Sequence, residues 1–165
     1  MTGSVDFWTN TANIVDIMDQ VEARVGRTFV LRLHGGEILH EVIESFSLQS
    51  GIRSAKVTAV GGVDKGSKLT VGPKYPMEGS IEPLIFILDA PREFTGVGTV
   101  FSDENGKPLL HMHGSCGRGG NSATGCVRSG MIVWLVMEVV ITEMLCDSAV
   151  RKIDPNTGFS LLTLL

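Results

Sequence analysis

Two histidines separated by a single residue are the strongest chemical signal in the chain. His111 and His113 lie in a segment, residues 108–116, whose composition and flanking turns predict a β-strand. Because residues i and i+2 of a strand point to the same face, these positions would present two imidazoles side by side. The spacing therefore predicts two nitrogen ligands for one divalent metal ion.

A third ligand has to come from another segment, and Cys126 is the best candidate. A glycine-rich turn over residues 117–121 would fold the following segment back so that Cys126 faces the two histidines. Two histidines and one cysteine suit Zn²⁺, and three protein ligands leave the fourth position of the ion open. Cys116 is a weaker candidate, since strand alternation directs its side chain to the face opposite His113.

Each of these residues also has a plain structural interpretation. Two histidines on one strand are as often hydrogen-bonded structural residues as metal ligands. A lone cysteine such as Cys126 commonly serves as a small hydrophobic side chain. The residue types and their spacing leave both interpretations open.

Charged residues near these positions could assist the same chemistry. Glu138 lies in the most apolar stretch, residues 131–141, where a carboxylate needs a partner. It could orient one of the histidines or accept a proton from a bound water, but a salt bridge to Arg128 or a solvent-exposed edge position explains it equally well. Arg118 and Arg128 flank the glycine-rich turn and could contact DNA phosphates. Ordinary solvated charge is the favoured interpretation of both arginines.

Composition limits the classes of protein to which the chain can belong. It has 165 residues, a net charge of -4 and 19% charged residues against 43% hydrophobic ones. This balance excludes global disorder and disfavours a freestanding nucleic-acid binder, which needs clustered lysines and arginines. Because so little charge is available to cover the surface, we expect some apolar area to be buried against another subunit.

The cysteine count and the apolar runs bear on location. Three cysteines at uneven spacing argue against a disulfide framework and for a reducing compartment. The first ten residues lack the features of a secretory signal, and the longest apolar run has 11 residues, which is too short to span a membrane. We therefore expect a cytoplasmic protein without a membrane segment.

The elements that must position the candidate ligands can be traced along the chain. Apolar residues at helical spacing predict an N-terminal helix over residues 11–26 and a second helix over residues 37–48. Strands are predicted over residues 28–33, 54–60, 67–71, 84–88, 94–102, 108–116 and 129–143, with one more possible over residues 159–165. The chain is predicted to be a single α+β domain, with a mostly antiparallel twisted sheet packed on a helix and an extra N-terminal helix.

A string of spaced residues resembles the PPC domain, the plants and prokaryotes conserved domain. The matching residues are Arg32-Leu33, Gly36-Glu37-Ile38-Leu39, Phe46, Ile52, Ala55, Val60-Gly61-Gly62, His111, His113, Gly125-Cys126 and Glu138-Val139. The resemblance covers about residues 27–145. It divides the chain into an N-terminal helical extension, residues 1–26, and a PPC-like domain, residues 27–165.

The resemblance implies a compact domain that assembles into a homotrimer. Stand-alone members are labelled "putative DNA-binding proteins", largely because plant members carry AT-hook motifs. Some members resemble metal proteins in which the two histidines join a third histidine after a Gly-Gly pair. Here the corresponding residues read Thr124-Gly125-Cys126, so cysteine stands where the third histidine would be.

These observations give two leading hypotheses and a weaker one. The first is a homotrimeric module that works through assembly and contacts with other proteins, with DNA binding only as the family label. The alternative is a zinc-dependent enzyme or small-ligand binder that uses His111, His113 and Cys126. Direct DNA binding is the weaker hypothesis, because the AT-hook core Arg-Gly-Arg-Pro is absent and Arg118 has only glycines beside it.

Overall fold

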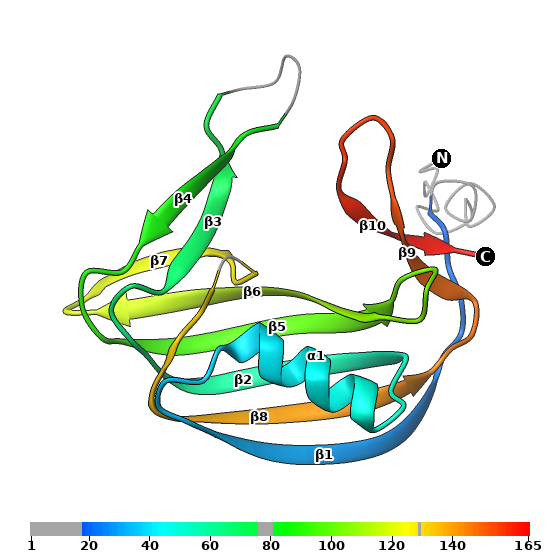
Figure 1. Cartoon of the computed structure of the whole chain (residues 1–165), viewed down its shortest axis with the longest axis horizontal. Helices are drawn as coiled ribbons and strands as arrows, with labels where there is room; N and C mark the ends of the chain where they lie inside the picture. Colours follow the sequence, from blue (N-terminus) through cyan, green and yellow to red (C-terminus); the bar gives the residue numbers. More distant parts are fainter. Residues whose placement is uncertain (1–17, 76–80, 129) are drawn as a thin grey trace, which may run out of the picture.

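The computed structural model describes residues 18–75, 81–128 and 130–165. These residues form one helix and ten strands (Figure 1). In chain order the elements are β1 (Arg24–His34), α1 (Leu39–Gln49), β2 (Ser54–Val63), β3 (Lys68–Pro73), β4 (Pro83–Ile87), β5 (Arg92–Ser102), β6 (Pro108–Arg118), β7 (Asn121–Cys126), β8 (Val133–Leu145), β9 (Ala149–Ile153) and β10 (Ser160–Leu164).

Eight of the strands form one sheet, in the order β1-β8-β2-β5-β6-β7-β3-β4, and every neighbouring pair is antiparallel. The remaining two strands, β9 and β10, form a separate antiparallel hairpin. The expected α+β class, with a mostly antiparallel sheet and a packed helix, is thus confirmed. In Figure 1 the β3-β4 and β9-β10 hairpins rise at opposite ends of the molecule, with β5 and β6 running between them.

The helix expected over residues 37–48 is present as α1. It buries Leu39, Ile43 and Ser47, which follow one another at the i, i+4 spacing of a single helix face. No side chain among the described residues caps its first turn. Instead the backbone N–H of Leu39 donates a hydrogen bond of 2.9 Å to the carbonyl of Met131, so the approach to β8 fixes where the helix begins.

The two faces of the sheet have different surroundings. Alternate residues of β2, β6 and β8, such as Val57, Met112 and Val139, enter the buried core. The intervening residues point to the other face, where Val97 and Val140 remain 59% and 37% exposed. The candidate ligands of β6 belong to this open face, since His111 and His113 alternate with the buried Met112.

The expected N-terminal helix over residues 11–26 is wrong in its described part. Residues 18–23 are neither helix nor strand, and residues 24–26 already belong to β1. Residues 24–26 form a strand and not a helix because β1 pairs with β8 up to Arg24, which lies opposite Leu145. Two apolar residues of the proposed helix face are not buried, since Val21 and Val25 are 40% and 75% exposed. Residues 11–17 lie outside the described residues.

Two further results concern the last third of the chain. The strand β9 was not expected from the sequence, whereas the short strand proposed over residues 159–165 is present as β10. Among the described residues, no helix is both long and apolar enough to cross a membrane.

Candidate metal centre

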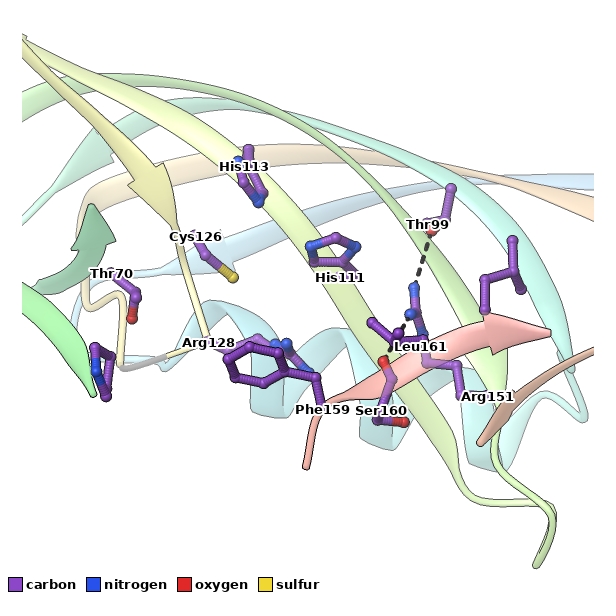
Figure 2. Close-up of a pocket in the computed structure, with 12 residues that line it drawn as sticks. Thr70, Thr99, His111, His113, Cys126, Arg128, Arg151, Phe159, Ser160 and Leu161 are labelled. Carbon is purple, nitrogen blue, oxygen red and sulfur yellow. Dashed lines mark hydrogen bonds between the residues drawn. The ribbon is translucent and has the colours of Figure 1, made fainter. Parts of the chain in front are cut away.

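The structure brings the three predicted ligands together. In the antiparallel pair of β6 and β7, His113 lies directly opposite Cys126, and His111 lies two residues away on the same face. One ligand atom from each of the three side chains lies within 4.8 Å of the other two. The imidazole rings meet edge to face, with centroids 5.1 Å apart (Figure 2).

A tight turn sets this register. Arg118 pairs with Asn121, so only Gly119 and Gly120 connect the two strands. Both glycines have positive φ, 58° and 83°, the backbone that a two-residue hairpin of type I′ requires. Because the turn is this short, the pairing of Cys126 with His113 follows from counting along the two strands.

The remaining cysteines do not reach the centre. Cys116 lies on the opposite face of β6 and is fully buried in the core, as alternation predicts. Burial raises the pKa of its thiol to about 11, so the group remains protonated at neutral pH. Cys146 is free and half-buried, and it lies after the end of β8.

The three ligands face a cavity of about 550 Å³. Its walls come from β3, β4, β5, β6 and β7 on one side and from the β9-β10 hairpin on the other. Apolar side chains of Phe159, Leu161 and Leu162 line the hairpin side. A second hollow of about 470 Å³ adjoins it between β7 and the β3-β4 hairpin and shares His113 and Cys126 as wall residues.

Two arginines dominate the charge around the centre. Arg128 and Arg151 both line the larger cavity, and Figure 2 shows them on the same side of the two histidines. Partial burial lowers the pKa of His111, and the positive charges of Arg151 and Arg128, together with His113, lower it further. These surroundings favour the neutral imidazole, which is the form that ligates a metal.

Glu138 does not join the centre. Its side chain is exposed, as in the solvent-exposed alternative, although β8 lies inside the sheet and not at its edge. It lies on β8 opposite Val60 of β2, and β5 separates β2 from β6 in the sheet. At about 4.8 Å per strand, this order places Glu138 roughly 14 Å from the histidine strand. Within one chain it can neither orient the histidines nor accept a proton at the cavity.

The two arginines proposed as DNA contacts lie in different places. Arg128 follows β7 and lines the cavity, whereas Arg118 ends β6 and lines a separate hollow with Trp134. Arg118 donates a hydrogen bond of 3.5 Å to the carbonyl of Pro91. They do not form one basic patch.

Sequence reasoning missed Arg151, which lies in the unexpected strand β9. The turn at residues 154–158 was recognisable by its Asp-Pro-Asn-Thr-Gly sequence. This turn joins β9 to β10, but no local pattern showed that the hairpin reaches β5 and β6.

Comparisons with known proteins agree with this fold. A family model described as the Plants and Prokaryotes Conserved (PCC) domain matches residues 20–145. The metal-containing protein from Archaeoglobus fulgidus is 28% identical, with a TM-score of 0.75, over 88% of this chain and 99% of that one. The plant- and prokaryote-conserved (PPC) protein from Pyrococcus horikoshii is 27% identical, with a TM-score of 0.76, over 90% and 99%.

More distant structures share the fold alone. A "putative DNA binding protein" from Bacteroides thetaiotaomicron is 18% identical, with a TM-score of 0.68, over 86% of this chain and 97% of that one. Comparison with curated proteins gives no match.

Proposed function

The chain belongs to the Plants and Prokaryotes Conserved (PCC) domain family, and from this premise we propose that it is a metal-dependent binder of small molecules. His111, His113 and Cys126 would be the metal ligands. The observation that carries the proposal is their convergence: one ligand atom from each lies within 4.8 Å of the others, at the wall of a 550 Å³ cavity. The relative from Archaeoglobus fulgidus, described as metal-containing, supports it.

The donor set fits zinc. Zinc binds imidazole nitrogen at about 2.0–2.1 Å and thiolate sulfur at about 2.3 Å, and tetrahedral ligands of these two types stand roughly 3.3–3.6 Å apart. Small side-chain rotations would bring the three atoms from their present spacing to these separations. When bound, zinc with three protein ligands would supply a Lewis acid with one position open.

The roles of the side chains follow from their positions. The rigid pairing of β6 with β5 and β7 holds His111 and His113 on one face. Cys126 supplies the thiolate from the neighbouring strand, and the apolar side chains of the β9-β10 hairpin would exclude water from a bound ligand. No carboxylate among the described residues lines the cavity, so a general base from this chain is not part of the proposal.

The metal can be measured directly. Protein purified without a histidine tag should contain close to one zinc ion per chain by elemental mass spectrometry. After replacement by cobalt, a charge-transfer absorption band should report the bond to sulfur. Cys126→Ser should remove this band and His111→Ala should weaken metal binding, whereas Cys146→Ser, the matched control, should change neither. Absence of metal, or a cobalt band that survives Cys126→Ser, would refute the assignment.

A second candidate function, a homotrimeric module for assembly and partner binding, is favoured by the open face of the sheet. The register places Val30 opposite Val140 and Thr58 opposite Val97, on strands that lie side by side. Val30 and Val97 are 76% and 59% exposed. Apolar side chains in such a row are typical of a surface that another subunit covers.

Sedimentation equilibrium tests this assembly. We expect three chains per particle, and Val97→Glu should dissociate it, because it would place a charge in the centre of the covered face. Val25→Glu introduces the same charge at an exposed position outside this row and serves as the control. A monomeric parent protein would overturn this second proposal without affecting the metal assignment.

Direct DNA binding is only the label that some structural neighbours carry. The net charge is -4, and Arg118 and Arg128 lie in separate hollows, so these two arginines do not form one basic surface. A salt titration of duplex binding checks this point, since phosphate contacts give a steep negative slope. We expect no measurable binding at moderate salt.

A further inference from the structure

The cavity beside the candidate metal centre holds a buried positive charge that has no acidic partner in the described part of the chain. The side chain of Arg151 reaches into it from β9, and the residue is only 4% exposed. Two of its nitrogens donate long hydrogen bonds to neutral oxygens, 3.4 Å to Thr99 Oγ1 and 3.3 Å to the carbonyl of Ser160 (Figure 2). Its Nε has no partner among the described residues.

Such an arrangement is costly unless something compensates the charge. A buried guanidinium has five N–H donors, and it is normally paired with a carboxylate or another anion. The ring of Phe101, 6.0 Å from the guanidinium carbon, gives only a weak cation–π contact at the limit of its range. None of the ion pairs among the described residues includes Arg151.

A second arginine faces the same space. Arg128 is exposed, follows β7 and lines the cavity, and it also has no ion-pair partner in the described part of the chain. Among the described residues, no aspartate or glutamate belongs to the cavity wall. A protein with a net charge of -4 therefore has a cavity whose described wall carries two arginines and no carboxylate.

We propose that Arg151 and Arg128 form an oxyanion subsite, which binds the carboxylate or phosphate group of a small organic molecule beside His111, His113 and Cys126. Arginine is suited to this role because its planar fork donates two parallel hydrogen bonds to such groups. The body of the ligand would lie against Phe159, which belongs to the apolar side of the cavity. The cavity volume of about 550 Å³ lies within the range for small-molecule sites.

The inference deepens the proposed function, because it names the class of molecule bound at that centre. The subsite itself requires no metal. It can be tested on the full chain both before and after zinc is added.

The probes are benzoate and phenyl phosphate, with benzyl alcohol as the neutral control, titrated by calorimetry at low chloride. We expect at least one anion to bind with submillimolar affinity and benzyl alcohol to bind at least about tenfold more weakly. Binding of benzoate alone would assign a carboxylate ligand, and binding of phenyl phosphate alone a phosphate ligand. Either result supports the subsite, and failure of both anions at millimolar concentration overturns it.

Three variants locate the anion. Arg151→Gln should weaken binding about 10- to 100-fold, the effect of losing a hydrogen bond to a charged group. Because Arg151 also ties β10 to β5, Arg128→Gln provides a second variant at an exposed position, with an expected loss of about 3- to 10-fold. Arg118→Gln removes the same charge outside the cavity and is the control. If Arg118→Gln and Arg128→Gln weaken binding equally, the effect is one of net charge and the subsite is refuted.

The two proposals can fail separately. Anion binding that depends on Arg128 and is unchanged by Cys126→Ser, in a protein that takes up no zinc, would support the subsite and contradict the metal assignment. Zinc binding by a protein that binds neither anion would support the metal assignment and contradict the subsite.

Discussion

The strand that carries the two histidines depends on a glycine, and replacing it should destabilise the fold. Gly114 follows His113 on β6 and lies opposite Gly96 of β5. The ring of Phe94, which is 2% exposed, lies across this glycine pair. A Cβ at Gly114 would stand 2.2 Å and 2.4 Å from two ring carbons of Phe94 and 3.1 Å from the carbonyl oxygen of Thr95. Real Cβ atoms essentially never approach other atoms as closely as the two ring contacts.

The size of the effect follows from how little can move. The buried ring of Phe94 cannot swing into solvent, and the strand backbone is held by β5 on one side and β7 on the other. Overpacking of this kind costs about 1–3 kcal/mol, and with two contacts this short we expect Gly114→Ala to lower the free energy of unfolding by about 2 kcal/mol. For a chain of this length, that corresponds to a fall in Tm of roughly 4–8 °C.

The assay is urea and thermal unfolding at equal protein concentration. Gly117→Ala, three residues along the same strand, is the matched control, because the nearest atom to its Cβ would be 4.0 Å away. The control also contains the small gain that any Gly→Ala change makes by restricting the unfolded chain. We expect it to change the free energy of unfolding by less than about 0.5 kcal/mol.

A double-mutant cycle identifies the cause. Phe94→Leu removes the ring, so Gly114→Ala should cost at least about 1 kcal/mol less in that background. The reasoning is refuted if Gly114→Ala is as harmless as Gly117→Ala, or if its cost is the same with leucine at position 94. Zinc content of the Gly114→Ala protein would show whether the strand displacement reaches the neighbouring His113.

Three further predictions use other parts of the molecule. Arg27 lowers the pKa of Glu143 from 4.5 to about 2 through hydrogen bonds of 2.7 Å. The folded state therefore binds fewer protons than the unfolded state in this range, so the stability from Glu143 is complete above pH 4.5 and is lost as the pH falls toward 2. The urea midpoint of unfolding should therefore depend less on pH across that window in Glu143→Gln than in the parent protein. Thiol labelling of the native protein at pH 8 should modify Cys126 but spare Cys116, and zinc should protect Cys126; fast labelling of Cys116 would contradict its burial. Leu135→Gly should leave the unfolding midpoint unchanged or raise it, because Leu135 has φ of 60° and is 67% exposed, and a clear fall would argue against backbone strain there.

The sequence predicted the candidate site because that site is local. His111, His113 and Cys126 belong to one hairpin, so strand alternation and the short turn at Gly119 and Gly120 determine which side chains meet. The helix α1 was equally predictable from the sequence, since its apolar residues recur at helical spacing and it ends before Gly51, which has a positive φ of 67°.

The parts that could not be predicted depend on the order of strands in the sheet. No local pattern shows that β2 and β5 lie between Glu138 on β8 and the histidines on β6. Arg151 reaches the cavity because β9 contacts β5 across about 50 residues of sequence, as its hydrogen bond to Thr99 shows. Apolar residues at helical spacing extend through Val25 and favoured a helix there. This segment is a strand because it pairs with β8, and nothing in the local sequence reveals that pairing.

The charges around the centre favour one explanation for two features, the cysteine ligand Cys126 and the unpaired buried Arg151. Three neutral imidazoles would leave both positive charges of a zinc ion beside Arg128 and Arg151, where no described residue of the cavity wall is a carboxylate. A thiolate at Cys126 would remove one of these charges. Burial and the charge of Arg128 lower the pKa of Arg151, and Cys126 partly opposes this lowering. An oxyanion on the arginines would supply further negative charge. The cysteine in place of a third histidine and the unpaired buried arginine then have one electrostatic explanation. A bound metal ion would raise the affinity of the cavity for an anionic ligand, and the anion would raise its affinity for the metal.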